Sequence, residues 1–500
     1  MKVIVIGSGF GGLTAAIRLC AKGFDVEIVE KRDKPGGRAY VYEQDGFVFD
    51  GGPTIITAPW LIHDLFELCG KKTEDYVTLV PLDPFYNVRF QDGSVFRYNG
   101  NSDEVKRQIR DFNPEDVAGY DGFFKKTEAI FKTGFDLIDQ PFTYVTDMLK
   151  VLPQLIGLRA DRSVASLVNT YIKDPRLRQV FSFHPLLVGG NPFQTTSIYA
   201  LIHKLEQEWG VWFAMGGTGA LVKALVQLFK EMGGRIRYES EVEQIIVAPS
   251  PTRNPQARGV RLTNDEEILA DVVVCNGDVA QAYLSLIPEV FRKHNTDKHI
   301  TSMRYSMSLF VIYFGTNKQY PEMAHHEILM GPRYKELVED VFTRKHLADD
   351  FSLYLHRPTA TDPSLAPPGG DSWYVLSPVP HLESDTDWTV MKKVYRDRIM
   401  NELEQRYMPG LQQHIVSEHI IDPVHFRDTL NSHLGSAFSV EPILTQSAWW
   451  RPHNKSEDIS GLYFVGAGAH PGGGPLARHR GRAAGVCAGD GRAAVLRLRA

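Results

Sequence analysis

The alternation of apolar and polar positions over the first thirty residues predicts a strand, a helix and a second strand. Lys2 to Ile6 is a short β-branched run, which is typical of a buried parallel strand. From Leu13 to Gly23 apolar residues recur at helical spacing, and a glycine ends the segment. Phe24 to Glu30 (FDVEIVE) follows as a second strand that ends in an acidic residue. This order indicates an α/β fold.

The turn between the first strand and the helix reads GSGFGG, from Gly7 to Gly12. In a GxGxxG motif at this place, Gly7 allows a tight turn and Gly9 lets the backbone approach a pyrophosphate. Gly12 lets the helix pack closely on the strand, and the free N–H groups of the helix N-terminus attract phosphates. Glu30 is placed to accept hydrogen bonds from ribose hydroxyls, the alternative being a solvated strand end. The whole context predicts dinucleotide binding.

Two more glycine motifs follow, Gly36-Gly37-Arg38 and Asp50-Gly51-Gly52-Pro53. The order GxGxxG, glutamate, GGR and DxGP resembles that of the amine-oxidase-like flavoprotein superfamily. The resemblance implies that the nucleotide is FAD. It also implies that Gly37, Arg38, Gly52 and Pro53 lie near the pyrophosphate and the flavin. Taken alone, Arg38 would be interpreted as a surface charge.

The segment QPFTYVTDMLKVLPQLIGLRA, in the middle of the chain, allows two interpretations. It is either an ordinary helix, with Asp147 and Lys150 as an i,i+3 ion pair, or an interfacial helix whose apolar face enters lipid. The second interpretation points Lys150 and Arg159 toward headgroups. The residues that would enter lipid are Phe142, Leu149, Leu152, Leu155 and Ile156.

Longer blocks extend the resemblance over residues 1 to about 474. They include FSFHPLLVGGNPF, EWGVWF, GGTGALV, DFSLYLHRPTATDPSLAPPG and GSAFSVEPILTQSAWWRPHN. These blocks closely resemble bacterial phytoene desaturases of the lycopene-forming type, in the carotenoid/retinoid oxidoreductase family. His184, in the first block, is interpreted either as an acid–base group or as a structural residue, as lone histidines more often are.

The resemblance implies an FAD-dependent enzyme that desaturates 15-cis-phytoene stepwise to lycopene in carotenoid biosynthesis. A hydride passes to the flavin, a neighbouring carbon loses a proton, and quinone or oxygen takes the electrons from the reduced flavin. Asp147 with Lys150 is the candidate catalytic pair for the proton. An apolar substrate of this kind comes from a membrane, so the resemblance also implies a lipid surface as partner and peripheral attachment.

The fold implied by the resemblance is an α/β (α+β composite) fold. It has a discontinuous Rossmann-type FAD-binding domain and an inserted substrate domain. The resemblance also implies that Val242 lies near the adenine and that Gly466 lies near the flavin. The predicted FAD domain comprises residues 1–80, 235–290 and 435–474, and the membrane-facing substrate domain 81–234 and 291–434.

Two other functions stay open. Relatives in the superfamily isomerise carotenoid double bonds without net oxidation, so the chain could be a redox-neutral isomerase. It could also be a flavin-binding chain made inactive by its atypical tail, residues 475–500, which carries six Arg and one Asp. Arg478-His479-Arg480 stands near the place of the family's Gly-Val-Ile-Gly turn, and a shifted reading frame of GC-rich codons for that turn gives Arg-His-Arg. We therefore interpret the tail as frame-shifted.

Composition narrows the class of protein further. The net charge of −5 provides no basic field for nucleic acid, and 500 residues favour two domains or one large composite fold. The four cysteines lie far apart in sequence, which fits neither a zinc site nor a disulfide framework and favours a reducing compartment. No metal-ligand cluster or Ser-His-Asp set is evident, and glycines interrupt the first apolar run, against a signal peptide. We expect a cytoplasmic, peripheral membrane protein.

Overall fold

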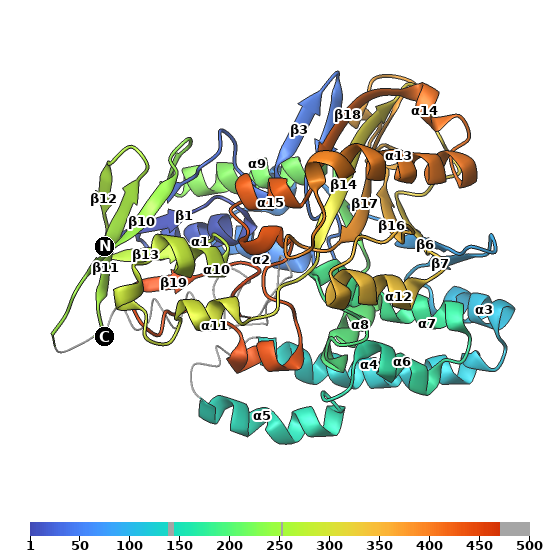
Figure 1. The fold of residues 1–500 in the computed structure, drawn as a ribbon, viewed down its shortest axis with the longest axis horizontal. Helices are drawn as coiled ribbons and strands as arrows, with labels where there is room; N and C mark the ends of the chain where they lie inside the picture. Colours follow the sequence, from blue (N-terminus) through green and yellow to red (C-terminus); the bar gives the residue numbers. More distant parts are fainter. Residues whose placement is uncertain (139–144, 252–253, 471–500) are drawn as a thin grey trace.

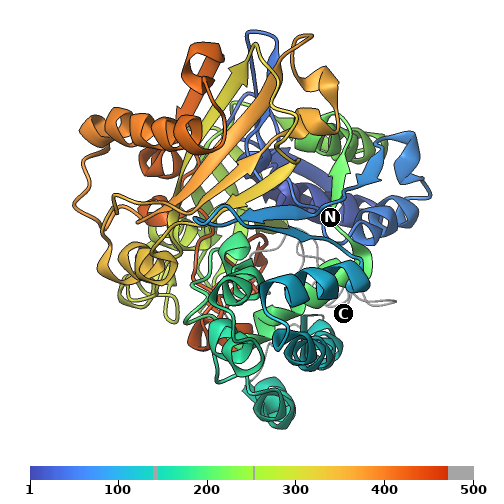
Figure 2. The ribbon, with the colours of Figure 1, turned by 90° about the vertical axis from the view of Figure 1, so that its right-hand side faces the viewer.

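The computed structural model describes residues 1–138, 145–251 and 254–470. Figure 1 shows a sheet near the N-terminus on the left, a second and larger sheet at the upper right, and a group of helices below the larger sheet. Figure 2, turned by 90°, keeps the same arrangement of helices beneath the larger sheet. The predicted atypical tail and Phe142 lie outside the described residues.

The first sheet is parallel, and its strands come from widely separated parts of the chain. In spatial order the strands are β19 (Leu462–Phe464), β13 (Val272–Cys275), β1 (Lys2–Ile6), β2 (Asp25–Val29) and β9 (Arg235–Arg237). Strand β1 is buried on both faces, which explains its unbroken apolar sequence. Val3 and Val5 face a core shared with helices α1 (Phe10–Cys20) and α9 (Gly217–Glu231). Ile4 and Ile6 face the opposite core, shared with a three-stranded sheet.

The second sheet has seven strands, and it is antiparallel except for the parallel pairing of β15 with β6. Its order is β18 (Ile415–Ile421), β14 (Ser308–Thr316), β17 (Asp371–Val379), β16 (Leu353–His356), β15 (His326–Leu329), β6 (Tyr86–Arg89) and β7 (Val95–Tyr98). The smaller sheets are β10 (Val242–Ala248) with β11 (Gln256–Leu262) and β12 (Glu267–Leu269), β3 (Val41–Gln44) with β4 (Phe47–Asp50), and β5 (Leu79–Pro81) with β8 (Trp212–Ala214).

Helices cover the seven-stranded sheet on both faces. On one face α13 (Trp388–Arg406) buries an apolar core against the strands. The other face packs on a helical group that shares the largest core of the protein. This group comprises α3 (Ser102–Phe112), α4 (Asp116–Ile138), α5 (Val145–Leu158), α6 (Val164–Tyr171), α7 (Pro175–Ser182) and α8 (Leu201–Trp209). The remaining helices are α2 (Trp60–Leu68), α10 (Val279–Gln281), α11 (Asp297–Thr301), α12 (Tyr334–Glu339), α14 (Leu411–His414) and α15 (Pro423–Asp428).

The predicted fold class is confirmed: a Rossmann-type parallel sheet, assembled from separate stretches of chain, carries an inserted second unit. The predicted strand–helix–strand order is found as β1, α1 and β2. In the described part of the segment with two interpretations, residues 145–158 form helix α5. In the part of the chain that the structure describes, every helix is too short or too polar to cross a bilayer. The residue boundaries of the two domains stay a prediction.

A buried ion pair closes one end of the seven-stranded sheet. Arg357 donates from Nε to Asp371 Oδ2 at 3.0 Å and from Nη2 to Asp371 Oδ1 at 3.2 Å. The backbone N–H of Tyr320 and the hydroxyl of Thr359 also donate to the Asp371 carboxylate, at 3.0 and 2.7 Å. The Asp371 carboxylate is fully buried, so these four hydrogen bonds replace the ones that water would otherwise make to it.

We predict that Asp371→Asn destabilises the fold by about 3–5 kcal/mol, because it leaves the Arg357 cation buried without a counter-charge. Thermal unfolding should show a Tm several degrees lower. The matched control is Asp349→Asn, which breaks the exposed Arg398–Asp349 pair and should leave the Tm nearly unchanged, since solvent screens such pairs. Equal Tm values for the two variants would contradict the prediction.

Candidate functional site

The glycine turn after β1 forms the floor of a site at the carboxyl end of the parallel sheet. Gly7 has a φ of +90°, in the region that glycine tolerates best. A Cβ on Gly12 would lie 2.0 Å from the carbonyl oxygen of Gly7, so only glycine lets α1 pack this closely on β1. Helix α1 begins directly after Gly9 and has no acidic residue in its first turn. Its free N–H groups therefore form an anion site with no competing carboxylate.

Glu30 holds this turn from the end of β2. One carboxylate oxygen accepts hydrogen bonds from the backbone N–H and the hydroxyl of Ser8, at 2.8 and 2.6 Å. The other accepts from the backbone N–H of Arg32 at 2.9 Å. Glu30 is buried, so it is not a solvated strand end. The Glu30 carboxylate still has free lone pairs, which could accept hydrogen bonds from further donors such as ribose hydroxyls.

The second and third glycine motifs lie against the first. Gly9 forms a backbone bridge with Gly36, whose φ of +121° favours glycine. A Cβ on Gly37 would stand 3.2 Å from the Cα of Gly9, and a Cβ on Gly52 would stand 1.8 Å from the carbonyl oxygen of Arg38. The three loops therefore meet through their backbones, with no room for side chains between them.

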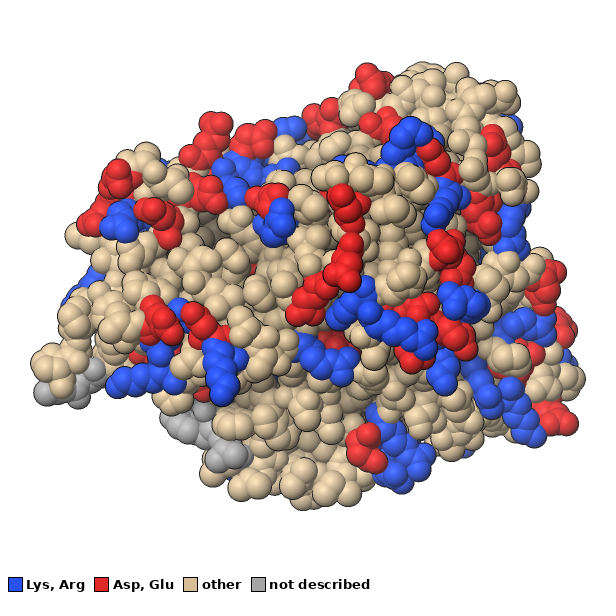
Figure 3. Space-filling model, viewed as in Figure 1, with Lys and Arg blue, Asp and Glu red and all other residues tan. Residues whose placement is uncertain are grey.

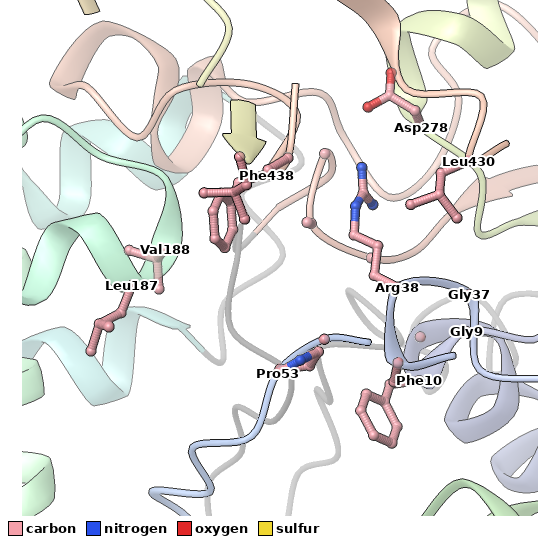
Figure 4. Close-up of a pocket in the computed structure, with 18 of the residues that line it drawn as sticks. Gly9, Phe10, Gly37, Arg38, Pro53, Leu187, Val188, Asp278, Leu430 and Phe438 are labelled. Atoms are coloured by element: carbon pink, nitrogen blue, oxygen red, sulfur yellow. The ribbon is translucent and has the colours of Figure 1, made fainter. Parts of the chain in front are cut away.

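Arg38 and Asp278 face the space above these loops (Figure 4). The Arg38 guanidinium donates from Nη2 to the Ser432 hydroxyl at 2.7 Å, while its Nε has no partner in the described part of the chain. Burial lowers the Arg38 pKa, and the nearby Asp278 carboxylate opposes that shift. Asp278 caps α10 with one oxygen, and the other is likewise unpaired among the described residues. Unpaired buried polar atoms beside a glycine cradle fit the polar edge of a bound cofactor.

One continuous cavity of about 740 Å³ joins this cradle to an apolar chamber. Figure 4 shows Leu187, Val188 and Phe438 on the side opposite Gly9 and Arg38. The cavity continues to Met148 and Trp450, from α5 and the chain segment beside it. The predicted cofactor residues that line it are Gly7, Gly9, Glu30, Gly37, Arg38, Gly52, Pro53, Val242 and Gly466. Gly12 is the predicted cofactor residue that does not line it, because it lies beneath the turn.

The predicted catalytic pair lies on α5. Lys150 Nζ and Asp147 Oδ1 are 3.3 Å apart, and the Lys150 side chain is 74% exposed. Among the described residues, Met148 and Leu155 of α5 line the cavity, whereas Asp147 and Lys150 do not. The structure therefore brings the pair together near the cavity but not within its lining. Its catalytic role stays a prediction.

Sequence reasoning missed a carboxylate in the cavity wall. Glu206, on α8, is fully buried and lines the cavity. It accepts a hydrogen bond from the Tyr86 hydroxyl at 2.7 Å, and its second oxygen lies 3.0 Å from His184 Nε2. His184 is thus paired with a buried acid, a contact between separate helical segments that no local pattern indicates.

Sequence reasoning also missed a group of three buried histidines, His325, His326 and His356. His326 and His356 face each other in the pairing of β15 with β16. Burial, together with the Arg357 guanidinium, lowers the His325 pKa to about 3, and burial with neighbouring imidazoles lowers the pKa of His326 well below its usual range. The imidazoles are therefore neutral. The adjacent HH in the sequence was a visible signal, but the strand register that brings in His356 was not.

Taken together, a dinucleotide cradle and an adjoining apolar chamber on a Rossmann-type sheet define a flavoprotein of the oxidoreductase class. The family model "Flavin containing amine oxidoreductase" matches residues 10–485, and the chain belongs to this family. The family supports FAD as the cofactor.

Individual relatives are similar over almost the full chain. The phytoene desaturase (lycopene-forming) of Pseudescherichia vulneris is 51% identical, over 95% of this chain and 96% of the relative. The enzyme of the same name from Pantoea ananas is 50% identical, over 94% and 95%. A solved oxidoreductase from Methanosarcina mazei is 17% identical with a TM-score of 0.62, covering 95% of this chain and 96% of that one, which supports the fold.

The Asp50 carboxyl, at the start of the third glycine motif, gives a pH prediction. Burial raises its pKa to about 6, and hydrogen bonds from backbone N–H groups oppose the shift. The unfolded chain loses the Asp50 proton near pH 4, whereas the fold retains it until about pH 6. The stability that the protonated group contributes is therefore complete below pH 4 and is lost as the pH rises through 6.

We predict that the Tm of Asp50→Asn minus the Tm of the unsubstituted protein is larger at pH 7 than at pH 4, because the Asn side chain cannot ionise. At about 1.4 kcal/mol per pKa unit, the gain is at most roughly 3 kcal/mol. Thermal unfolding at both pH values measures it, and the difference at pH 4 is the internal control for steric effects. Parallel pH profiles for the two proteins would contradict the raised pKa.

Proposed function

We propose that this chain is an FAD-dependent phytoene desaturase that converts 15-cis-phytoene stepwise to lycopene in carotenoid biosynthesis. The observation that carries the proposal is the identity of about half of all positions with lycopene-forming phytoene desaturases over almost the entire chain. The single cavity that joins a dinucleotide cradle to an apolar chamber supports it.

The residues of the cradle fit FAD. The turn of Gly7 and Gly9, with the N-terminus of α1 behind it, would hold the pyrophosphate. Glu30 would accept hydrogen bonds from the ribose, and Val242 would pack near the adenine. Arg38 would donate its unpaired Nε–H to a polar edge of the cofactor. The remaining predicted contacts, from Gly12, Gly37, Gly52, Pro53 and Gly466, would be made by the backbone or by packing. The bound cofactor supplies the hydride acceptor.

The apolar chamber fits a hydrocarbon substrate. A carotene has no polar group to anchor, so affinity comes from removing apolar surface from water, at about 25 cal/mol per Å². Phe183, Leu186, Leu205 and Ile328 line the chamber and would orient the chain by shape alone. Within the wall, the Glu206 carboxylate is paired with Tyr86 and His184. The electron acceptor, quinone or oxygen, stays a prediction.

The test is to express the chain, purify it with FAD and give it 15-cis-phytoene in liposomes with a quinone. We expect a bound-flavin absorbance spectrum and products that lose two hydrogens per step, ending in the three-banded spectrum of lycopene. The variant Gly9→Val should retain the fold by circular dichroism but lose both flavin and activity, because its side chain fills the cradle.

The two alternatives give different results in the same assay. A product with the mass of phytoene but a changed double-bond geometry would show a carotenoid isomerase and contradict the proposal. Bound flavin with unchanged phytoene would indicate an inactive flavoprotein. The gene sequence decides whether a shifted reading frame explains the tail: the hypothesis fails unless another frame encodes a Gly-Val-Ile-Gly-like turn.

We further infer that α5 and its neighbours form a membrane-facing surface at the mouth of the cavity. Leu149, Leu152 and Ile156 of α5 are 61%, 43% and 63% exposed, and Trp450 beside them is 46% exposed. Figure 3 shows a largely uncharged area where α5 lies in Figure 1. Because Trp450 and the α5 residues Met148 and Leu155 also line the cavity, an apolar substrate could pass from lipid without crossing water.

We predict that Leu152→Glu with Ile156→Glu weakens binding to liposomes roughly tenfold or more, since burying each such side chain is worth about 1.5–3 kcal/mol. Flotation of the protein with liposomes measures the bound fraction. The matched control is Val390→Glu, an apolar residue 60% exposed on α13, on the far side of the larger sheet. Equal binding of both variants would place the membrane contact elsewhere.

A further inference from the structure

A line of hydrogen bonds leads from the cavity wall into the core of the larger sheet. The hydroxyl of Thr54 lies 2.7 Å from that of Tyr374 and 3.2 Å from that of Tyr354. The Tyr354 hydroxyl in turn lies 2.7 Å from Nδ1 of His326. The Nδ1 atom of His326 lies 3.2 Å from Nδ1 of His356. Every neighbouring pair of atoms in this line is within proton-transfer distance.

The line begins at the meeting point of the cofactor cradle and the chamber. Thr54 directly follows Pro53, and Thr54, Tyr354 and Tyr374 all line the cavity. The strand register explains the geometry. Tyr354 and His356 are two residues apart on β16 and so point to the same face, where His356 opposes His326 of β15. The sheet therefore fixes the histidines directly behind the tyrosine.

The far end of the line approaches the surface. The imidazole rings of His356 and His325 have centroids 4.9 Å apart. His325 Nδ1 shares a hydrogen bond of 2.6 Å with the hydroxyl of Thr361, a residue that is only half-buried. The Arg357 cation, paired with Asp371, lowers the His325 pKa, and its charge disfavours a bound metal ion as well as a permanently protonated imidazole.

On the basis of the proposed function, we propose that Tyr354 is the proton acceptor of the desaturation and that His326 and His356 carry the proton away. Loss of a hydride to FAD leaves an allylic cation on the substrate. The neighbouring C–H bond breaks, its electron pair forms the new double bond, and the proton goes to the Tyr354 oxygen. The former hydroxyl proton of Tyr354 passes to Nδ1 of His326, where the facing Nδ1 of His356 shares it.

The weak basicity of these groups suits this task. An allylic carbocation is a strong acid, so even an imidazole whose pKa is lowered by burial accepts its proton downhill. The same burial keeps the imidazoles unprotonated and ready at neutral pH. The relay itself then places no fixed charge beside the hydrocarbon before the hydride leaves, which preserves the apolar character of this part of the chamber.

The test compares Tyr354→Phe and His326→Asn with Tyr320→Phe, which removes a buried phenol that is outside this line and does not line the cavity. In anaerobic single turnovers we expect polyene formation to slow about 100-fold in the first two variants, as for loss of an acid–base group, and to be unchanged in the third. We also expect the unsubstituted enzyme to react more slowly in D₂O, and Tyr354→Phe to lose this solvent effect. Flavin content and Tm of each variant control for folding.

A second measurement needs no turnover. In protein labelled with ¹⁵N-histidine, the Nδ1 nuclei of His326 and His356 should both have the chemical shift of an unprotonated imidazole nitrogen in the resting protein, and the His326 Nδ1 shift should change in Tyr354→Phe, which removes its hydrogen bond. A protonated Nδ1 on His326 at rest would overturn the relay, because that atom could not accept the Tyr354 proton. If the purified protein contains one equivalent of divalent metal and His356→Asn contains none, the histidines form a metal site and the relay is overturned.

The outcomes also separate this relay from the proposed function. If the unsubstituted protein desaturates phytoene and Tyr354→Phe does so equally fast, the relay is wrong and the proposed function stands. If Asp147→Asn instead abolishes turnover, the α5 pair is the acceptor and the relay is likewise wrong. If the unsubstituted protein forms no polyene, the proposed function fails, and the ¹⁵N shifts alone decide whether Nδ1 of His326 is free to accept a proton.

Discussion

The site depends on a backbone contact that leaves no room for side chains. The turn at Gly9 bridges the loop at Gly36, and the loop at Gly52 lies against the carbonyl of Arg38. A Cβ at Gly52 would require a shift of the backbone itself, because it would stand 1.8 Å from that oxygen. Once these loops are fixed, Arg38 has to point into the cavity and Pro53 has to begin its wall. The cradle and the first part of the chamber are therefore consequences of one packing constraint.

From this contact the cavity changes from polar to apolar within one continuous space. At the cradle end, Arg38 and Asp278 offer unpaired polar atoms, whereas Leu187, Val188 and Phe438 face them from the other side. A cofactor bound at the polar end would close that end of the chamber. A hydrocarbon bound at the apolar end would then meet it directly, since no separate passage divides the two. This continuity links the dinucleotide fold to chemistry on an apolar substrate.

The cofactor half of the site could be predicted from sequence, because its determinants are local. The GxGxxG spacing and the acid after β2 indicated Gly7, Gly9 and Glu30, and the family resemblance added Arg38. The structure has all four in the lining of one cavity. The chamber could not be predicted in the same way. Its polar groups meet through the pairing of distant strands or helices, as Tyr354 and His326 do. Single-sequence periodicity gives the face of a strand but not its partner's register.

Helix α5 shows a different limit of sequence reasoning, because it has one buried and one exposed apolar face. Met148 and Val151 are buried against the chain segment beside the cavity, whereas Leu149 and Ile156 are exposed. Apolar spacing alone could not separate these two faces, since both consist of leucine-like residues.

The pairing of polar groups in the chamber wall explains how a largely apolar cavity tolerates them. Glu206 is satisfied by Tyr86 and His184, and Tyr354 by Thr54 and His326, so neither pair exposes an unmatched group to a hydrocarbon. In the part of the cavity wall that the structure describes, the unmatched atoms include Arg38 Nε, Asp278 Oδ2, Arg32 Nη1 and the Tyr334 hydroxyl, and behind the wall the Nε2 atoms of the three histidines. Unmatched buried atoms cost free energy unless a partner satisfies them. The atoms of Arg38 and Asp278 lie where a cofactor would supply that partner.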